Sequence, residues 1–350
     1  MMILAILVLI ALSVDLLLIL LWNFNFKEYH LSENVTRDVS IMIAARNEEG
    51  NIVACLESLL NLDYPVEHLE ILIGDDQSTD RTAEIVEAYM MQYPHIRLYT
   101  IEEKTIEGNG KANALNQLIK HAHYDVLLFT DADIQVPRQW VWSMLQGLGN
   151  DVGMVTGTSL IAGESWLARL QRMDWLHATG MLKVMADLGK PVTTMGNNML
   201  ITKEAYLRVG GFENLPFSVT EDLELFKHVS QKYATPMMFS SDVLNMSAPQ
   251  KTLKDLLIQR KRWIQGAFGL PTRMVLLLLI QSGFIILIIG LMLFNPVWAL
   301  VALMAKLLFR YLFALMVGRK INQKVELLTS FAFEMFNLFF SVVSLFYYLF

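Results

Sequence analysis

Hydrophobic residues form long uninterrupted runs at both ends of the chain. The first run covers residues 1–22 with a single charge, Asp15, and at about 1.5 Å per residue it would form a helix of roughly 33 Å, enough to span a bilayer. It lacks the basic start and the cleavage site of a signal peptide, so we predict a retained transmembrane anchor. Three more transmembrane helices are predicted within residues 274–350: Met274 to Phe294, Val297 to Val317, and Leu328 to Phe350.

Between these ends, apolar runs of strand length alternate with amphipathic stretches of helical period. This alternation is typical of a mainly parallel sheet with helices on both faces. We therefore predict a single Rossmann-like α/β domain over residues 23–250, followed by an amphipathic interfacial helix over residues 251–273. The predicted parallel strands are Val39 to Ala45, Glu70 to Gly74, Ile96 to Thr100, and Val126 to Thr130.

Polar clusters follow the predicted strands at the points where the strands end. Asn47 and Glu48 follow the first strand, and Asp75 and Asp76 follow the second. Because ligands of open α/β sheets bind at the carboxyl ends of the strands, we expect these side chains to converge. No strand is followed by GxGxxG or GxxxxGK[ST], which argues against a dinucleotide-dependent dehydrogenase or a P-loop nucleotidase.

A later strand ends in Asp131-x-Asp133, which places two carboxylates on one side of an extended segment. That spacing suits a hard divalent ion, Mg²⁺ or Mn²⁺, shared with the phosphates of a ligand. The alternative is that the two carboxylates only solvate a turn. His121 and His123 are two residues apart without a third ligand in the sequence nearby, and we interpret them as surface residues.

Two further motifs have both a structural and a catalytic interpretation. Ser218 to Glu221 matches the capping-box pattern, so that Thr220-Glu221-Asp222 is only a helix start, or else Asp222 accepts a proton from an attacking hydroxyl. The second motif, Gln259-x-x-Arg262-Trp263, fits an interfacial helix with basic and aromatic anchors. In the catalytic interpretation, Arg262 binds a leaving diphosphate through its planar fork of donors and Trp263 forms a wall of an acceptor site.

Composition and charge narrow the function further. The mean hydropathy is +0.40, and the formal net charge of −6 argues against a partner made of nucleic acid. Cys55 is the one cysteine, so an intrachain disulfide is impossible and a reducing compartment is expected. The basic segment 318–324 should face the cytoplasm by the positive-inside rule. This orientation puts residues 23–273 in the cytoplasm and the N-terminus outside, in an integral protein of the plasma membrane.

Charges also occur inside the predicted spans, where they are costly. Lys306 and Arg310 lie four residues apart on one face of the third span, and Glu334 should reach a similar depth on the fourth. We expect a buried ion pair, with the Lys306 side chain extended toward the membrane interface. The alternative is a polar seam that handles the headgroup of a lipid or a sugar.

The motifs occur in a recognisable order. Asp75-Asp76, Asp131-x-Asp133, Thr220-Glu221-Asp222 and Gln259-x-x-Arg262-Trp263 are accompanied by an IAARNEE start, a GNGKANALN loop and clustered C-terminal spans. Over nearly its whole length the sequence resembles membrane-bound family 2 glycosyltransferases of the GT-A fold. These include ceramide glucosyltransferase and the cellulose, chitin, hyaluronan and poly-N-acetylglucosamine synthases.

The resemblance implies roles for the matching residues. Asp75 and Asp76 would hold the uracil of a UDP-sugar, Lys111 would support the nucleotide, and Asp131 would reach the ribose and diphosphate. Asp133, with Asp131, would ligate the metal. The remaining donor-site residues implied in this way are Arg46, Asn47, Glu48, Gly196, Asn197 and Glu221.

For catalysis, the resemblance implies that Asp222 is the general base and that Gln259, Arg262 and Trp263 close the donor and acceptor sites. The implied reaction is an inverting, metal-dependent transfer from a UDP-sugar to a lipid or lipid-linked acceptor, which forms a β-glycosidic bond.

Two other functions stay open. One is a processive synthase that elongates a β-linked glycan, for which four spans would have to form the pore alone or within a homo-oligomer. The other is a catalytically inactive, nucleotide-binding scaffold for a membrane partner subunit. The sequence leaves the sugar, the acceptor and the choice between Mg²⁺ and Mn²⁺ undecided.

Overall fold

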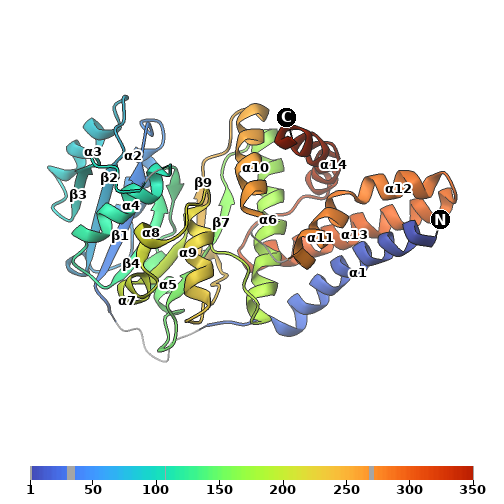
Figure 1. Cartoon of the computed structure of the whole chain (residues 1–350), viewed down its shortest axis with the longest axis horizontal. Helices are drawn as coiled ribbons and strands as arrows, with labels where there is room; N and C mark the ends of the chain where they lie inside the picture. Colours follow the sequence, from blue (N-terminus) through green and yellow to red (C-terminus); the bar gives the residue numbers. More distant parts are fainter. Residues whose placement is uncertain (1, 30–35, 107, 268–271, 350) are drawn as a thin grey trace. The chain divides into compact units, whose positions relative to one another are not determined.

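The computed structural model describes residues 2–29, 36–106, 108–267 and 272–349 (Figure 1). The chain divides into two compact units. The sheet unit comprises Lys27–Leu160 and Gly189–Ala248, and the helical unit comprises Met1–Phe26, Ile161–Leu188 and Pro249–Phe350. The sequence predicted a single domain over residues 23–250. The structure instead groups Ile161–Leu188 with the apolar helices of the helical unit.

A six-stranded sheet in the order β3-β2-β1-β4-β8-β6 organises the sheet unit. Its first four strands are parallel: β1 (Val39–Ala45), β2 (Leu69–Asp75), β3 (Ile96–Thr100) and β4 (Val126–Asp131). The predicted ends of β1 and β3 are those of the structure. Antiparallel to β4 lies β8 (Met199–Thr202), which also pairs antiparallel with β6 (Met154–Thr156). A smaller sheet has the order β5 (Ile134–Gln135), β9 (Leu244–Ser247) and β7 (Thr158–Ile161).

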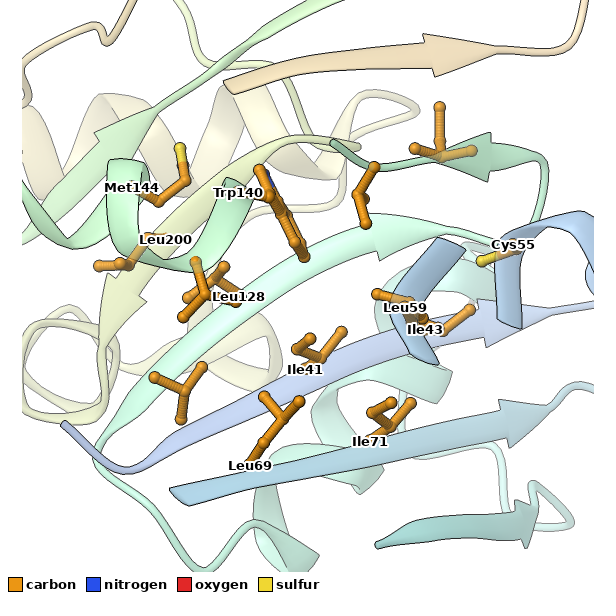
Figure 2. Packing of buried hydrophobic residues seen from close by; sticks show 14 of the residues in the cluster. Ile41, Ile43, Cys55, Leu59, Leu69, Ile71, Leu128, Trp140, Met144 and Leu200 are labelled. Atoms are coloured by element: carbon orange, nitrogen blue, oxygen red, sulfur yellow. The ribbon is translucent and has the colours of Figure 1, made fainter. Parts of the chain in front are cut away.

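Helices cover both faces of the large sheet because successive strand residues point to opposite faces. On one face, Ile41 and Ile43 of β1 pack in a buried cluster with Leu59 of α2 (Ile52–Leu60) (Figure 2). Met42 of the same strand faces the second cluster, which includes Leu115 of α4 (Gly110–His121). The other helices of this unit are α3 (Thr82–Met90), α5 (Trp140–Leu145), α7 (Lys203–Arg208), α8 (Gly211–Asn214), α9 (Glu221–Ser230), and the 3-10 helices Val66–His68 and Ser241–Val243.

The helical unit contains the apolar helices that the sequence predicted. Among the described residues, α1 (Met2–Asn25) and α13 (Pro296–Lys320) are long and apolar enough to cross a membrane. The predicted span from Met274 to Phe294 is broken into α11 (Thr272–Ser282) and α12 (Phe284–Met292), with a bend of 52°. The pair passes the same test if it forms one span. The fourth predicted span is helical as α14 (Leu327–Leu349) but does not pass this test over its described residues.

Two more helices complete this unit. Ser165 caps the N-terminus of α6 (Trp166–Asp187) through its side chain, and α6 packs on α13 and α14. The helix α10 (Leu253–Ala267) packs on α14 and covers most of the predicted interfacial helix over residues 251–273. Residues 268–271 of that prediction lie outside the described part of the chain.

Candidate active site

Three strand ends of the sheet unit bring acidic side chains together. The register pairs Ala45 of β1 with Asp75 of β2, and Ala44 of β1 with Asp131 of β4. The two aspartates therefore flank the carboxyl end of β1 on either side. This is the edge at which the sequence predicted a ligand site.

The turn after β1 is fixed to the loop after β2 by hydrogen bonds. Asn47 has a positive φ of 55°, a conformation that asparagine tolerates better than most residues. Its backbone N–H donates to Ser78 Oγ at 3.0 Å, and its Oδ1 accepts from the N–H of Thr79 at 2.8 Å. The N–H of Glu48 donates to Thr82 Oγ1 at 2.8 Å. Asn47 and Glu48 therefore hold the turn after β1 against the loop after β2 through backbone and side-chain hydrogen bonds.

Asp75 and Asp76 differ in their surroundings. Asp75 is buried, and its Oδ2 accepts from the N–H of Ser78 at 3.2 Å. Its Oδ1 is buried without a hydrogen-bond partner among the described residues. Asp76 lies 3.4 Å from Arg46, and its carboxylate lies so close to Gly110 that a Cβ there would come within 2.5 Å of Oδ2. A glycine at the start of α4 is therefore required for Asp76 to occupy this position.

Lys111, in the first turn of α4, joins two acidic segments. Its Nζ lies 2.5 Å from Asp131 Oδ1 and 3.6 Å from Glu221 Oε1. Burial disfavours the ammonium, but the neighbouring Asp131 and Glu221 carboxylates outweigh burial and raise the pKa of Lys111 above its ordinary value. Lys111 therefore stays charged and supplies a fixed positive charge to the strand edge.

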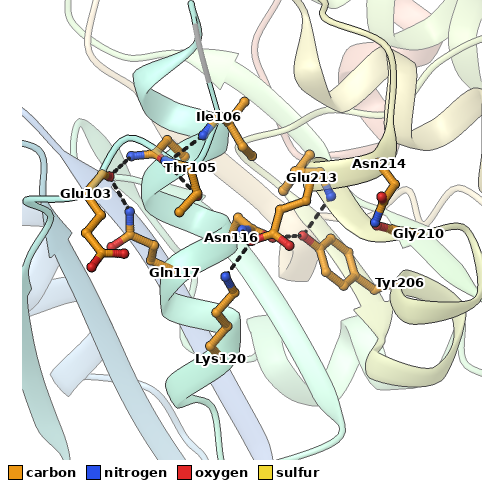
Figure 3. Close-up of polar contacts among 12 residues, drawn as sticks. Glu103, Thr105, Ile106, Asn116, Gln117, Lys120, Tyr206, Gly210, Glu213 and Asn214 are labelled. Atoms are coloured by element: carbon orange, nitrogen blue, oxygen red, sulfur yellow. Dashed lines mark hydrogen bonds and ion pairs between the residues drawn. The ribbon is translucent and has the colours of Figure 1, made fainter.

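A polar network fixes the position of α4 and hence of Lys111 (Figure 3). Tyr206 donates through its hydroxyl to Asn116 Oδ1 at 2.9 Å, and Asn116 donates to Glu213 Oε1 at 2.7 Å. Lys120 also donates to Glu213, at 2.5 Å. Gln117, also on α4, donates through its Nε2 to the backbone carbonyl of Glu103 at 2.6 Å. These contacts tie α4 to the loop before it and to α8.

Asn109 is a site residue to which the sequence analysis gave no role. Its Oδ1 caps α4 by accepting from the N–H of Ala112 at 3.0 Å. Its Nδ2 donates to Glu221 Oε2 at 3.1 Å and to the carbonyl of Ser218 at 3.0 Å. The GNGKANALN loop was a signal for a tight turn, but the partners of Asn109 lie far along the chain and no local pattern indicates them.

The helix that carries Asp222 begins where the sequence predicted but lacks the capping box. Thr220 occupies the N-cap position of α9 and its side chain makes no cap hydrogen bond. Asp222 Oδ2 instead accepts from the backbone N–H of Gly196 at 2.9 Å, and Oδ1 accepts from the N–H of Leu223 at 2.8 Å. The capping-box interpretation of Ser218 to Glu221 is therefore wrong.

Asp222 has the electrostatic setting of a general base. Burial and the adjacent Glu221 carboxylate raise the pKa of Asp222 to about 6, while Lys111 and the two backbone N–H groups act in the opposite direction. A carboxylate with a pKa near the working pH is deprotonated at neutrality and still basic enough to take a proton.

The segment that holds Asp222 in place is itself fixed. Asn197 Oδ1 accepts from Ser159 Oγ at 2.9 Å, and the carbonyl of Asn197 accepts from Asn245 Nδ2 at 3.1 Å. The buried Asn198 accepts from the indole N–H of Trp140 at 2.9 Å. Gly196 and Asn197 thus lie beside Asp222, and they are supported from the core by Asn198 and Trp140, neither of which was assigned a role from the sequence.

Asp133 lies in a group of carboxylates that suits a divalent cation. Burial, Asp131 and Glu48 raise the pKa of Asp133 to about 7, and Lys111 and a hydrogen bond from Ser247 Oγ at 3.2 Å act against them. No group of three histidine, cysteine, aspartate or glutamate residues in the described ranges could hold a metal by itself. A Mg²⁺ or Mn²⁺ ion held by Asp131 and Asp133 fits this site if substrate phosphates supply further ligands, as is usual for Mg²⁺.

The remaining predicted site residues belong to the helical unit. Gln259, Arg262 and Trp263 lie on α10, where the ring of Trp263 is 5.7 Å from that of Trp175. The guanidinium of Arg260, which the sequence analysis did not single out, lies 5.2 Å from the ring centroid of Trp263. His121 stacks on Tyr99 and His123 pairs with Glu70 at 2.8 Å, so neither is placed as a metal ligand.

A parallel-dominated sheet with an acidic carboxyl edge and the N-terminus of α4 at that edge is the framework of a GT-A glycosyltransferase. The fold matches that of a mannosyltransferase from Pyrobaculum calidifontis, solved in complex with GDP-Man and Mn²⁺. The TM-score is 0.61 at 18% identity, covering 98% of this chain and 99% of that one. The chain belongs to glycosyl transferase family 21, whose family model matches residues 3–349. The prediction of a glycosyltransferase with the GT-A fold is confirmed.

Curated relatives share the sequence over most of this chain. A probable glycosyltransferase, YdaM, of Bacillus subtilis is 30% identical over 70% of this chain and 57% of its own length. The poly-beta-1,6-N-acetyl-D-glucosamine synthase of Staphylococcus epidermidis is 29% identical over 65% of this chain and 54% of its own. The beta-monoglucosyldiacylglycerol synthase of Synechocystis is 27% identical over 66% of this chain and 48% of its own. The chain thus matches about half the length of these relatives.

Proposed function

We propose that this glycosyltransferase transfers a sugar from a UDP-sugar to a membrane lipid or lipid-linked acceptor, with inversion at the anomeric carbon. The observation that carries the proposal is the setting of Asp222, whose carboxylate is held by the N–H groups of Gly196 and Leu223 and whose pKa is raised to about 6. Lys111 and Asp131 lie in the same charged cluster. A base and a diphosphate-binding edge in one site suit a single displacement.

In the proposed step the acceptor hydroxyl gives its proton to Asp222 as its oxygen forms a bond to the anomeric carbon. The bond from that carbon to the diphosphate oxygen breaks, and UDP leaves with the electron pair. An α-linked donor would therefore give a β-linked product. The ammonium of Lys111, held between Asp131 and Glu221, stabilises negative charge on the departing diphosphate.

The donor would bind across the strand edge. Asp75 and Asp76, with the turn formed by Arg46, Asn47 and Glu48, would hold the base, and Asp131 would reach the ribose and diphosphate. A Mg²⁺ or Mn²⁺ ion bound by Asp131 and Asp133 would neutralise charge on the leaving group. The structure of the Pyrobaculum protein with GDP-Man and Mn²⁺ supports a nucleotide-sugar donor and a divalent ion.

The membrane part of the proposal rests on helix composition. Arg319 and Lys320 in the last turn of α13 and Lys324 just after it would lie in the cytoplasm, which would place the sheet unit there too and the N-terminus outside. Gln259, Arg262 and Trp263 on α10 would then close the donor and acceptor sites near the membrane surface. The name of the Synechocystis relative supports a lipid acceptor.

The test is to incubate membranes that contain the protein with radiolabelled UDP-sugars, and separately GDP-mannose, in Mg²⁺, Mn²⁺ or EDTA. Label that partitions into organic solvent and disappears in Asp222→Asn is the expected result. The matched control is Asp151→Asn, which changes an exposed carboxylate of the same unit and should leave transfer unchanged. Label in a long polymer would replace this proposal by a polysaccharide synthase. Absence of Asp222-dependent label with every donor would favour the inactive scaffold.

A further inference from the structure

The helical unit contains a polar cavity of about 280 Å³. We call it the polar cavity; its walls come from α1, α6, α10, α11, α12, α13 and α14. The charged side chains that line it are Asp15, Asp174, Arg260, Lys306, Arg310 and Glu334. A cavity of about 10–15 Å³ is enough to hold one buried water, so this cavity is large enough for a polar group of several heavy atoms.

The charges that line the polar cavity are matched one to one. Lys306 Nζ lies 2.8 Å from Asp15 Oδ2, Arg310 pairs with Glu334, and Arg260 pairs with Asp174. Three cations and three carboxylates leave no net charge. The Arg310–Glu334 contact confirms the buried ion pair expected from the sequence. The expectation that Lys306 extends toward the interface is wrong, because Lys306 is buried and pairs with Asp15 of the first predicted span.

Ion pairs alone would serve to hold the helices together. The cavity is also lined by a histidine whose buried ring nitrogen lacks a hydrogen-bond partner among the described residues. His177 is 8% exposed, and its Nε2 has no hydrogen-bond partner among the described residues. The nearest carboxylate oxygen, Glu334 Oε1, is 3.7 Å away. The ring is stacked between Phe313 and Phe333, with centroids at 6.3 Å and 5.7 Å, so it is held in one orientation. A buried polar atom of this kind normally has a partner.

We propose that the polar cavity binds the uncharged, hydroxyl-bearing headgroup of a membrane lipid. A phosphate would need an excess of positive charge, and each cation here already has a carboxylate. Hydroxyls and ester or amide carbonyls instead match what the cavity offers, namely remaining N–H donors of Lys306 and Arg310, carboxylate lone pairs and the imidazole of His177. That the bound lipid is also the sugar acceptor rests on the proposed function.

The experiment uses the full chain in phosphatidylcholine nanodiscs with two photoactivatable probes that carry the same diazirine chain, a diacylglycerol and a phosphatidic acid. We expect saturable labelling by the diacylglycerol probe, at least tenfold above that by the phosphatidic acid probe. Unlabelled diacylglycerol should compete, and labelled peptides should map to α6, α13 or α14. Equal labelling by both probes, or labelling that does not saturate, would overturn the proposal.

Charge variants make the test specific to the cavity. Glu334→Gln leaves Arg310 without its carboxylate, so labelling by the phosphatidic acid probe should rise several-fold and that by diacylglycerol should fall. Combining Glu334→Gln with Arg310→Gln should restore the preference for the uncharged probe. Glu164→Gln is the matched control, because Glu164 is 74% exposed in the same unit. If the folded Glu334→Gln protein keeps the native preference for the diacylglycerol probe over the phosphatidic acid probe, the proposal is contradicted. If this variant does not fold, the probe preference of the native protein still decides.

Asp222→Asn separates this site from the proposed function. The variant should lose sugar transfer and keep the native labelling pattern. If the native protein labels selectively but transfers no sugar, the lipid site stands and the proposed reaction is refuted. If it transfers sugar to lipid without selective labelling, the reaction stands and the lipid site is refuted.

Discussion

The backbone N–H of Gly196 donates a 2.9 Å hydrogen bond to Oδ2 of Asp222, and a Cβ at residue 196 would lie 2.7 Å from that same oxygen. The closeness of the backbone to the carboxylate is therefore available only to glycine. It fixes the direction in which the proposed base presents its free lone pairs.

Gly196→Ala should displace the Asp222 carboxylate and lower the rate of sugar transfer. A displacement of about 1 Å near reacting atoms typically lowers the rate about 10²-fold. Initial rates at saturating donor provide the measurement. Gly50→Ala is the control, because no atom lies within 4 Å of a Cβ built there. A native rate in Gly196→Ala would show that Asp222 is not the base.

The rate of transfer should depend on the ionisation of Asp222. Its pKa is raised to about 6, and only the deprotonated carboxylate can accept the acceptor's proton. The rate at saturating donor and acceptor should therefore be level above about pH 7 and fall about tenfold per pH unit well below 6. Rates measured from pH 5 to 8 check this. A rate that stays level down to pH 5 is incompatible with the assignment.

Asp222→Asn should also change the pH dependence of stability. The folded-state pKa of about 6 lies above the ordinary aspartate value of 3.8, so the folded protein holds this proton more tightly than the unfolded chain does. This favourable contribution is present below about pH 4 and is lost as pH rises through about 6. The thermal midpoint of the variant relative to the native protein should therefore rise between pH 4 and 7.5. A constant difference between the two midpoints across this range would contradict the raised pKa.

A divalent ion should stabilise the native protein through Asp133. Burial and the neighbouring carboxylates of Asp131 and Glu48 raise the pKa of Asp133 to about 7, and a cation would relieve the repulsion among the three carboxylates. Adding Mn²⁺ with UDP should raise the thermal midpoint, and EDTA should reverse the shift. Asp133→Asn should lose most of this response, whereas Asp242→Asn, an exposed position of the same unit, should keep it. An equal Mn²⁺ shift in both variants would remove Asp133 from the metal site.

Local patterns predicted the framework of the fold well. The strand from Val39 to Ala45 is a run of apolar residues bounded by polar ones, and such a run is a strong strand signal. The convergence of Asp75 and Asp131 followed from strand order, since parallel strands end at one edge. The antiparallel strand β8 and the grouping of α6 with the apolar helices depend on long-range packing, which sequence period does not report.

The candidate site was predictable as a set of residues but not as a set of contacts. Ser218 to Glu221 has the residue types of a capping box, and only the structure shows that α9 lacks the box and that Asp222 accepts a hydrogen bond from Gly196. Asn109 and Glu221 lie over a hundred positions apart and still share a hydrogen bond. Partners at such separation leave no trace in the spacing of either motif.

The ion pair between Lys306 and Asp15 also bears on the order in which the protein is made. At roughly 5–20 residues per second, a ribosome adds the lysine about 15–60 seconds after the aspartate. If α1 spans the membrane as proposed, the helix would during that interval carry an unmatched acid into the lipid, which is costly at the centre of a helix. Correct insertion of the amino-terminal segment would thus be completed by Lys306, which is synthesised much later. Truncations before α13 should leave this segment exposed to the quality-control proteases of the membrane.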